Sequence, residues 1–174
     1  GGGGAPLAVP AAVLETYAGT GPLAFLKRKR VDIATYKIKS MDLVRPEGTL
    51  AFARTAENAW QFRPAGEKAW VRSGFAADDM ADVLANLTAE AYAAENPPDL
   101  APYGLDRPAF TLTIRAEDPV TGGSPVEKTL EIGRQVPGKD VYYAREKADP
   151  MIFTLGKIKK ERLEAEFKED RKVL

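Results

Sequence analysis

The sequence predicts an α+β fold in which mainly antiparallel sheets, formed by two meanders, pack with helices. Alternating apolar residues mark short strands over about 35–62 and again over 110–155. Helical spacing of apolar residues marks one segment between these groups and another at the end of the chain. The order of strands, helix, strands and helix favours antiparallel pairing over alternating βαβ units.

Residues 1–24 are interpreted as a linker or tag remnant that also holds the tail of a preceding repeat, and residues 25–174 as a single domain. The chain begins with four glycines and no initiator Met, as expected of an excised fragment. A short strand over 7–9 and a short helix over 10–17 are predicted within this leading part.

The first meander is predicted to have three strands, separated by turns at 46–49 and 57–58. Apolar residues alternate with polar or small ones along each strand, so one face of the sheet is expected to point inward. The inward positions are Met41, Leu43, Leu50, Phe52, Trp60 and Phe62.

The helix that follows is predicted over 78–87. Its apolar residues share one helical face, and three aspartates lie near its start, where the helix dipole favours negative charge. The apolar face consists of Met80, Val83, Leu84 and Leu87, and the aspartates are Asp78, Asp79 and Asp82.

A turn-rich connector over 100–108 leads to a second meander of about four strands. These are predicted at 110–114, 128–132, 141–145 and 151–155. The closing helix is then expected to run from about 157 to 167. Its inward stripe is expected to consist of Ile158, the aliphatic stem of Arg162, Leu163 and Phe167.

Composition excludes several classes of chemistry. The 174 residues contain no Cys and no His, which excludes disulfides, thiolate nucleophiles and imidazole-based acid–base catalysis. The 25 basic residues balance the 25 acidic ones, so the net charge does not indicate binding to a nucleic acid. The glycines at 133 and 138 lack the Ser or Thr that a phosphate-binding loop requires. We therefore expect no catalytic residue, no cofactor and no metal.

The carboxylate pairs do not change this expectation. Glu117 and Asp118 are adjacent in a loop, and Asp78 and Asp79 are adjacent at a helix start. Adjacent side chains do not face one another, so neither pair suits two-carboxylate catalysis. With Asp82, the helical pair also lacks the alternating spacing and glycine of a calcium loop. Solvent exposure or helix capping is the expected role.

Two features suggest contact with a partner. The basic run at 27–30 suits either an anionic lipid surface, a nucleic acid or, most simply, a solvated helix end. Among the aromatic residues, Trp60 is expected in the core. Trp70, Tyr142 and Tyr143 are candidates for contact with a sugar or a peptide ligand.

A short motif occurs twice. Residues 25–31 (Phe-Leu-Lys-Arg-Lys-Arg-Val) resemble residues 167–173 (Phe-Lys-Glu-Asp-Arg-Lys-Val) at a constant offset of 142 residues. Each copy is expected to follow a short strand and a helix. The match is explained either by a tandem array or by coincidence between two basic helix ends, and we favour the array.

The order of motifs in the second half resembles the domain of unknown function 4340 (DUF4340) family. The resemblance covers about residues 30–174, and its most specific element is Tyr-Gly-Leu-Asp-Arg-Pro at 103–108. The other elements are Glu-Asn-Pro at 95–97, Leu-Glu-Ile-Gly at 130–133, Val-Tyr-Tyr-Ala-Arg at 141–145, Met-Ile-Phe at 151–153 and the segment 167–172.

The resemblance implies a bacterial domain on the outer, periplasmic side of a membrane, anchored by a segment outside residues 1–174. It implies no catalytic residues, and its protein partners would be ABC-type transport components or neighbouring repeats. The expected function is a non-catalytic structural or interaction module that binds no nucleic acid. The alternative is a carbohydrate- or peptide-binding domain of the cell envelope that uses Trp70 or Tyr142.

Overall fold

The computed structural model describes residues 29–117 and 125–164, which form antiparallel strands and two α-helices. The parts of the predictions that fall in 1–28, 118–124 and 165–174 lie outside the described residues. The elements are η2 (Thr35–Lys37), β1 (Ile38–Arg45), β2 (Gly48–Arg54), β3 (Trp60–Arg63), β4 (Val71–Arg72), α2 (Phe75–Ala85), β5 (Tyr92–Glu95), η3 (Ala101–Tyr103), β6 (Phe110–Ala116), β7 (Val126–Gln135), β8 (Val141–Glu146), β9 (Met151–Gly156) and α3 (Lys157–Glu164).

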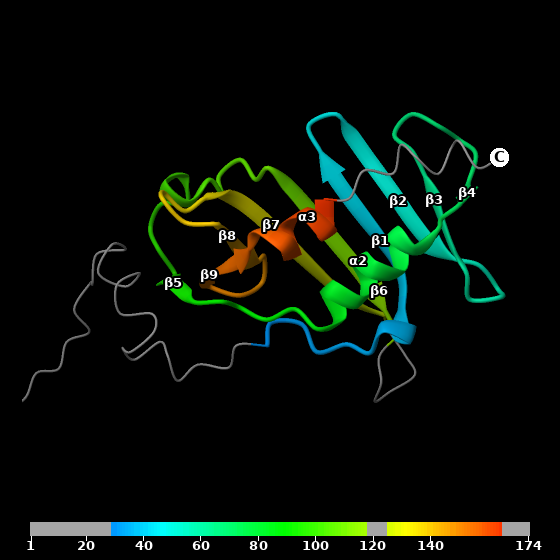
Figure 1. Cartoon of the computed structure of the whole chain (residues 1–174), viewed down its shortest axis with the longest axis horizontal. Helices are drawn as coiled ribbons and strands as arrows, with labels where there is room; N and C mark the ends of the chain where they lie inside the picture. Colours follow the sequence, from blue (N-terminus) through cyan, green and yellow to red (C-terminus); the bar gives the residue numbers. More distant parts are fainter. Residues whose placement is uncertain (1–28, 118–124, 165–174) are drawn as a thin grey trace, which may run out of the picture.

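All nine strands belong to one sheet, in the order β4-β3-β2-β1-β6-β7-β8-β9-β5 (Figure 1). The sequence predicted more than one sheet, and this differs because β1 pairs with β6 and joins the two halves. In that pair Met41 lies opposite Ile114 and Leu43 opposite Leu112. The two strands thus present their apolar residues on the same face, which makes the junction part of the core.

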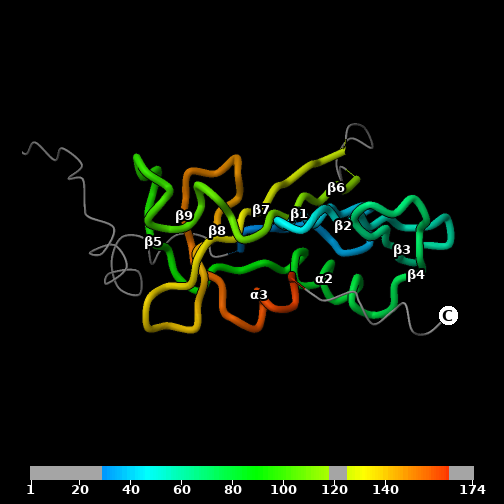
Figure 2. Tube along the Cα trace, turned by 90° about the horizontal axis from the view of Figure 1, so that it is seen from above, coloured from blue at the N-terminus to red at the C-terminus, as the bar shows by residue number. Residues whose placement is uncertain are grey.

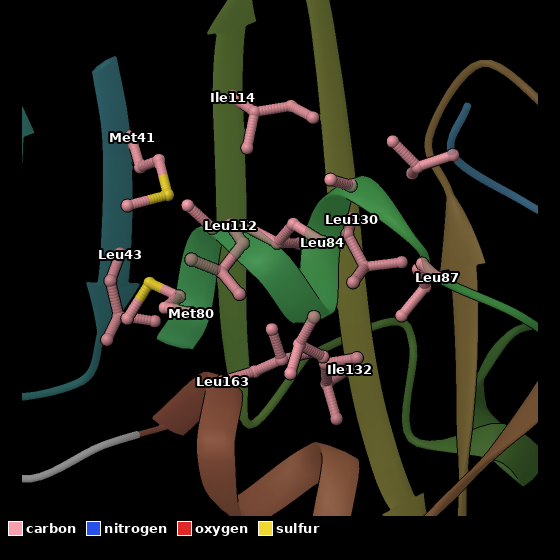
Figure 3. Packing of buried hydrophobic residues seen from close by; sticks show 14 of the residues in the cluster. Met41, Leu43, Met80, Leu84, Leu87, Leu112, Ile114, Leu130, Ile132 and Leu163 are labelled. Carbon is pink, nitrogen blue, oxygen red and sulfur yellow. The ribbon is translucent and has the colours of Figure 1, made fainter. Parts of the chain in front are cut away.

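Both helices lie on the same side of the sheet (Figure 2). The predicted apolar face of α2 is buried, and the helix starts three residues earlier than expected, at Phe75. Figure 3 shows the side chains that fill the space between helices and strands. They include Met41, Leu43, Met80, Leu84, Leu87, Leu112, Ile114, Leu130, Ile132 and Leu163.

The closing helix packs through a narrower face than predicted. Leu163 is fully buried, but Ile158 exposes 74% of its surface, so its placement in the inward stripe was wrong. Five residues separate them, which places their side chains about 140° apart around a helix axis. A helix that rests on the sheet through Leu163 therefore turns Ile158 toward solvent.

An ion pair ties the two helices together. The guanidinium of Arg162 donates hydrogen bonds to both carboxylate oxygens of Asp79, with Nε 2.7 Å from Oδ2. These hydrogen bonds lower the pKa of Asp79. Because both side chains are about 40% exposed, we expect the pair to contribute under about 1 kcal/mol.

A second, smaller core lies on the opposite face of the sheet. Its members come from β5, β8, β9, the loop around η3 and the turn between β7 and β8. They are Ala93, Ala94, Tyr103, Leu105, Val136, Tyr143 and Ile152. The loop at 103–108, which is the most specific element of the family resemblance, therefore packs against the sheet through Tyr103 and Leu105.

Two glycines allow this loop to approach the sheet closely. Gly104 ends η3 with φ of +66°, and a Cβ there would lie 2.8 Å from the backbone nitrogen of Arg134. A Cβ on Gly133 would lie 2.2 Å from the carbonyl oxygen of Tyr103. The pairing register of β7 with β8 shifts between Ile132 and Gln135, at this contact. The loop and the irregular part of β7 thus fit together only without a side chain at either glycine.

We expect Gly133→Ala to lower the free energy of unfolding by about 1–3 kcal/mol, because the new methyl group would overlap the loop backbone. The matched control is Gly156→Ala, where a Cβ would lie an ordinary 3.5 Å from its nearest neighbour, Oε1 of Glu90. Urea denaturation followed by circular dichroism measures both. Equal stability of the two variants would contradict this account of the contact.

Candidate functional site

Residues 29–31 form a short extended segment beside the connection from α2 to β5. Lys29 forms an antiparallel bridge with Thr88. The backbone N–H of Arg30 donates to the carbonyl oxygen of Leu87 at 2.7 Å, and the N–H of Val31 reaches the same oxygen at 3.4 Å. We call the place that receives these residues the docking groove, defined by Leu87, Thr88, Tyr92, Asp149 and Phe153.

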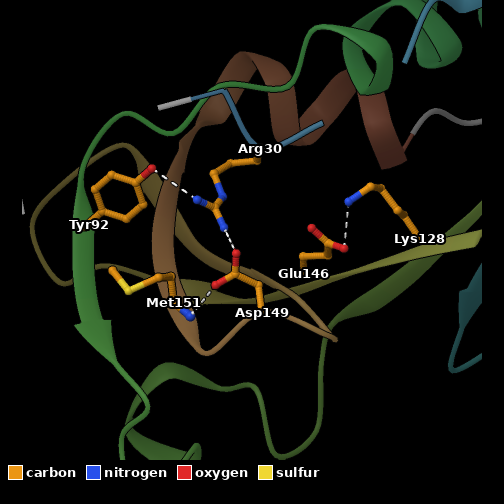
Figure 4. Close-up of polar contacts among 6 residues, drawn as sticks. All are labelled: Arg30, Tyr92, Lys128, Glu146, Asp149 and Met151. Carbon is orange, nitrogen blue, oxygen red and sulfur yellow. Dashed lines mark hydrogen bonds and ion pairs between the residues drawn. The ribbon is translucent and has the colours of Figure 1, made fainter. Parts of the chain in front are cut away.

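Arg30 anchors the segment in this groove (Figure 4). Its Nη1 donates a hydrogen bond to the hydroxyl oxygen of Tyr92 at 3.2 Å, and its Nη2 forms an ion pair with Asp149. Asp149 is itself held in place, because its Oδ1 accepts a hydrogen bond from the backbone N–H of Met151 at 2.8 Å. Only 10% of the Arg30 side chain is exposed.

Two aromatic rings complete the surroundings of the guanidinium. Its Cζ lies 5.6 Å from the ring centre of Tyr92 and 5.4 Å from that of Phe153, within the range of cation–π attraction. Burial by itself lowers the pKa of Arg30, but the hydrogen bond with Tyr92 and the charge of Asp149 outweigh burial and raise that pKa. The groove therefore favours a permanent cation.

Below the anchor the chain encloses little space. Val31 is buried in the main core next to Arg30. A cavity of about 10 Å³ adjoins both residues and is also lined by Lys128 and Glu146, which form an ion pair at 2.9 Å. This volume matches a single water molecule and excludes an organic ligand. Arg30 and Val31 therefore leave almost no free volume beneath them.

The structure corrects the prediction for the basic run. A solvated helix end was expected over 27–30, but residues 29 and 30 are extended and the Arg30 side chain is buried. The physical reason is that its acceptors come from far along the chain, 62 and 119 residues away. Residues 27 and 28 lie outside the described part.

The three aromatic candidates for ligand contact lie apart. Tyr143 is 3% exposed, and its ring packs edge-on against Tyr103 at 5.1 Å in the second core. Tyr142 points to the helix side, where Nζ of Lys160 lies 5.0 Å from its ring centre. Trp70 is 40% exposed, and the guanidinium of Arg63 lies 5.1 Å from its ring centre. Of the three, Trp70 has the most accessible ring.

Two exposed aromatic residues, Trp70 and Phe75, flank β4 in the sequence at one end of the sheet. Trp70 directly precedes β4, which within the described residues pairs with β3 alone. Phe75, at the start of α2, is 92% exposed. The sequence pattern does not single out Phe75, because this residue precedes the predicted helix. We call Arg63, Trp70, Arg72 and Phe75 the β4 edge surface.

The remaining candidates have structural roles. Trp60 is buried in the core, as predicted, with the guanidinium of Arg54 4.3 Å from its ring centre. Asp79 is paired with Arg162, and Glu117 lies 3.5 Å from Nζ of Lys39. Over 29–117 and 125–164, no group of three or more acidic side chains could hold a metal ion. Neither described helix combines the length and apolar character needed to cross a bilayer.

These features define a sheet domain with two helices on one face, a docked basic segment and an exposed apolar edge. The chain belongs to the family described as Domain of unknown function (DUF4340), which matches residues 60–172. That match includes the loop over 103–108 and Asp149 of the docking groove. The chain matches no curated protein and no solved structure.

We expect Arg30→Ala to lower the free energy of unfolding by about 1.5–3 kcal/mol, because it removes hydrogen bonds to a charged group and leaves Asp149 without its cation. The control is Lys29→Ala, whose ion pair with Asp32 is exposed and should contribute under about 1 kcal/mol. Chemical denaturation of both variants measures the difference. If Arg30→Ala cost no more than Lys29→Ala, Arg30 would not be an anchor.

Proposed function

We propose that the chain is a non-catalytic interaction module that binds a protein partner through the β4 edge surface. The observation that carries this proposal is the exposure of two large aromatic side chains, Trp70 and Phe75, beside a two-residue edge strand. Aromatic residues are enriched among the side chains that contribute most to binding between proteins. Exposed sheet edges also accept an additional strand from a partner.

The charges of this surface favour a partner of acidic character. Arg63 and Arg72 are both exposed, on β3 and β4, close in sequence to Trp70. Cations at the rim of an apolar contact mainly select a partner of complementary charge. The partner that suits the β4 edge surface is therefore an extended, acidic protein segment with apolar side chains.

The proposed setting is the outer side of a bacterial membrane, beside components of an ABC-type transporter. What supports this setting is the family resemblance, which is an analogy at the level of the domain. The two-helix face and the second core leave the β4 end of the sheet as the side that such a partner would approach.

A carbohydrate- or peptide-binding role in the cell envelope is the second candidate. The observation that favours it is the same exposed ring of Trp70, because an aromatic face is a surface on which a sugar can stack. This role would need Trp70 but not the cations of Arg63 and Arg72. The two candidates therefore differ in what binds and in which side chains matter.

We expect a photo-crosslinking residue placed at Phe75 to form adducts with a protein in cells, because this position lies inside the proposed contact. The control places the same residue at Val44, an exposed apolar position on the interior strand β1. Adding Trp70→Ala should reduce the Phe75 adducts at least fivefold.

Adducts of equal yield at Phe75 and Val44, or none at Phe75, would contradict the proposed contact. A glycan array with the purified chain tests the alternative. Binding that disappears with Trp70→Ala but persists with Arg72→Ala would favour a carbohydrate ligand over a protein partner.

A further inference from the structure

We propose that the docking groove also binds the C-terminal segment 167–173 of a second copy of this chain. The groove lies at the end of the sheet away from β4, so this contact is independent of the β4 edge surface. We identify the occupant by comparing the side chains of residues 29–31, which the groove holds, with those of residues 171–173.

The groove selects a cation followed by an aliphatic residue. Asp149 and the Tyr92 hydroxyl bind the guanidinium of Arg30, and the rings of Tyr92 and Phe153 lie beside it. The next residue, Val31, enters the main core. The backbone of this segment adds hydrogen bonds to the carbonyl oxygen of Leu87, which any residue can form.

The segment 167–173 repeats this chemistry in the same order. Lys172 and Val173 correspond to Arg30 and Val31, and Arg171 corresponds to Lys29, at the constant offset of 142 residues. A lysine ammonium can donate to both a carboxylate and a hydroxyl, and it is attracted by aromatic rings. The C-terminal segment thus has the side chains that the groove recognises.

Competition decides when the second copy binds. The chain's own residues 29–31 have the advantage of being tethered near the groove, and an arginine fork matches a carboxylate better than an ammonium does. A segment from another copy should therefore enter when Arg30 is weakened. In a tandem array, the C-terminal segment of one copy would occupy the groove of the next, in the way that residues 29–31 occupy it here.

The first test uses a fluorescein-labelled peptide of residues 165–174 and measures its fluorescence anisotropy with the full chain. We expect the Arg30→Ala chain to bind the peptide at least tenfold more tightly than the unmodified chain. A Lys172→Ala peptide, and an added Asp149→Asn substitution in the chain, should each reduce this binding at least tenfold. Equal binding to both chains, or binding that does not depend on Lys172, would overturn the proposal.

The second test does not depend on the Arg30→Ala chain being folded. Five substitutions convert residues 25–31 into the sequence of 167–173, and these are Leu26→Lys, Lys27→Glu, Arg28→Asp, Lys29→Arg and Arg30→Lys. We expect this chain to melt within a few degrees of the unmodified one. A control chain of the same composition, in which Arg28→Lys and Arg30→Asp take the place of Arg28→Asp and Arg30→Lys, would set an acidic residue against Asp149 and should melt at a much lower temperature. Equal melting temperatures for the two altered chains would overturn the proposal.

Discussion

The pairing of β1 with β6 holds the two halves of the sheet together. It joins strands that are separated by the whole of β2, β3, β4, α2 and β5, and it makes one sheet of nine strands. Both strands turn their apolar residues toward the helices, so α2 and α3 share a single core. With that face covered by helices, the most exposed aromatic side chains are found at the β4 end of the sheet.

The two ends of the sheet differ in a way that follows from this arrangement. At the β4 end, a short edge strand and two exposed aromatic rings leave apolar surface uncovered. At the β5 end, the docking groove already holds a basic segment of the same chain. The first end suits a separate partner, whereas the second shows how a polypeptide segment is recognised. Both interpretations treat the molecule as a scaffold for contacts between chains.

Local pattern predicted much of the fold. Alternation placed Trp60 and the β6 residues inward, and helical spacing identified the buried face of α2. The sequence could not predict that all the strands form a single sheet. The β1–β6 pairing joins two segments that are far apart in the chain, and no local pattern in either segment indicates the other as its partner. The prediction for Ile158 was wrong because it assigned Ile158 and Leu163 to the same face of a short helix. Their side chains lie about 140° apart around the helix axis.

The sites were harder to predict than the fold, again for reasons of distance along the chain. The carboxylate near Arg30 in the sequence, Asp32, pairs with Lys29, whereas the partner of Arg30 is Asp149, 119 residues away, which no local pattern indicates. Tyr142 and Tyr143 are adjacent, so only the strand register decides which one enters the second core. Phe75 could have been noticed as an apolar residue just ahead of the predicted helix. In the structure it is the first residue of α2 and is exposed.

Hydrogen exchange of the full chain, resolved to single amides, tests most directly whether residues 29–31 are part of the same cooperative unit as the sheet. We expect the amides of Arg30 and Val31, which donate to the carbonyl oxygen of Leu87, to exchange on the same slow timescale as the central amides of β6. If β6 were protected while Arg30 and Val31 exchanged as fast as an unfolded peptide, the segment would not be docked, and the account of the groove would be wrong.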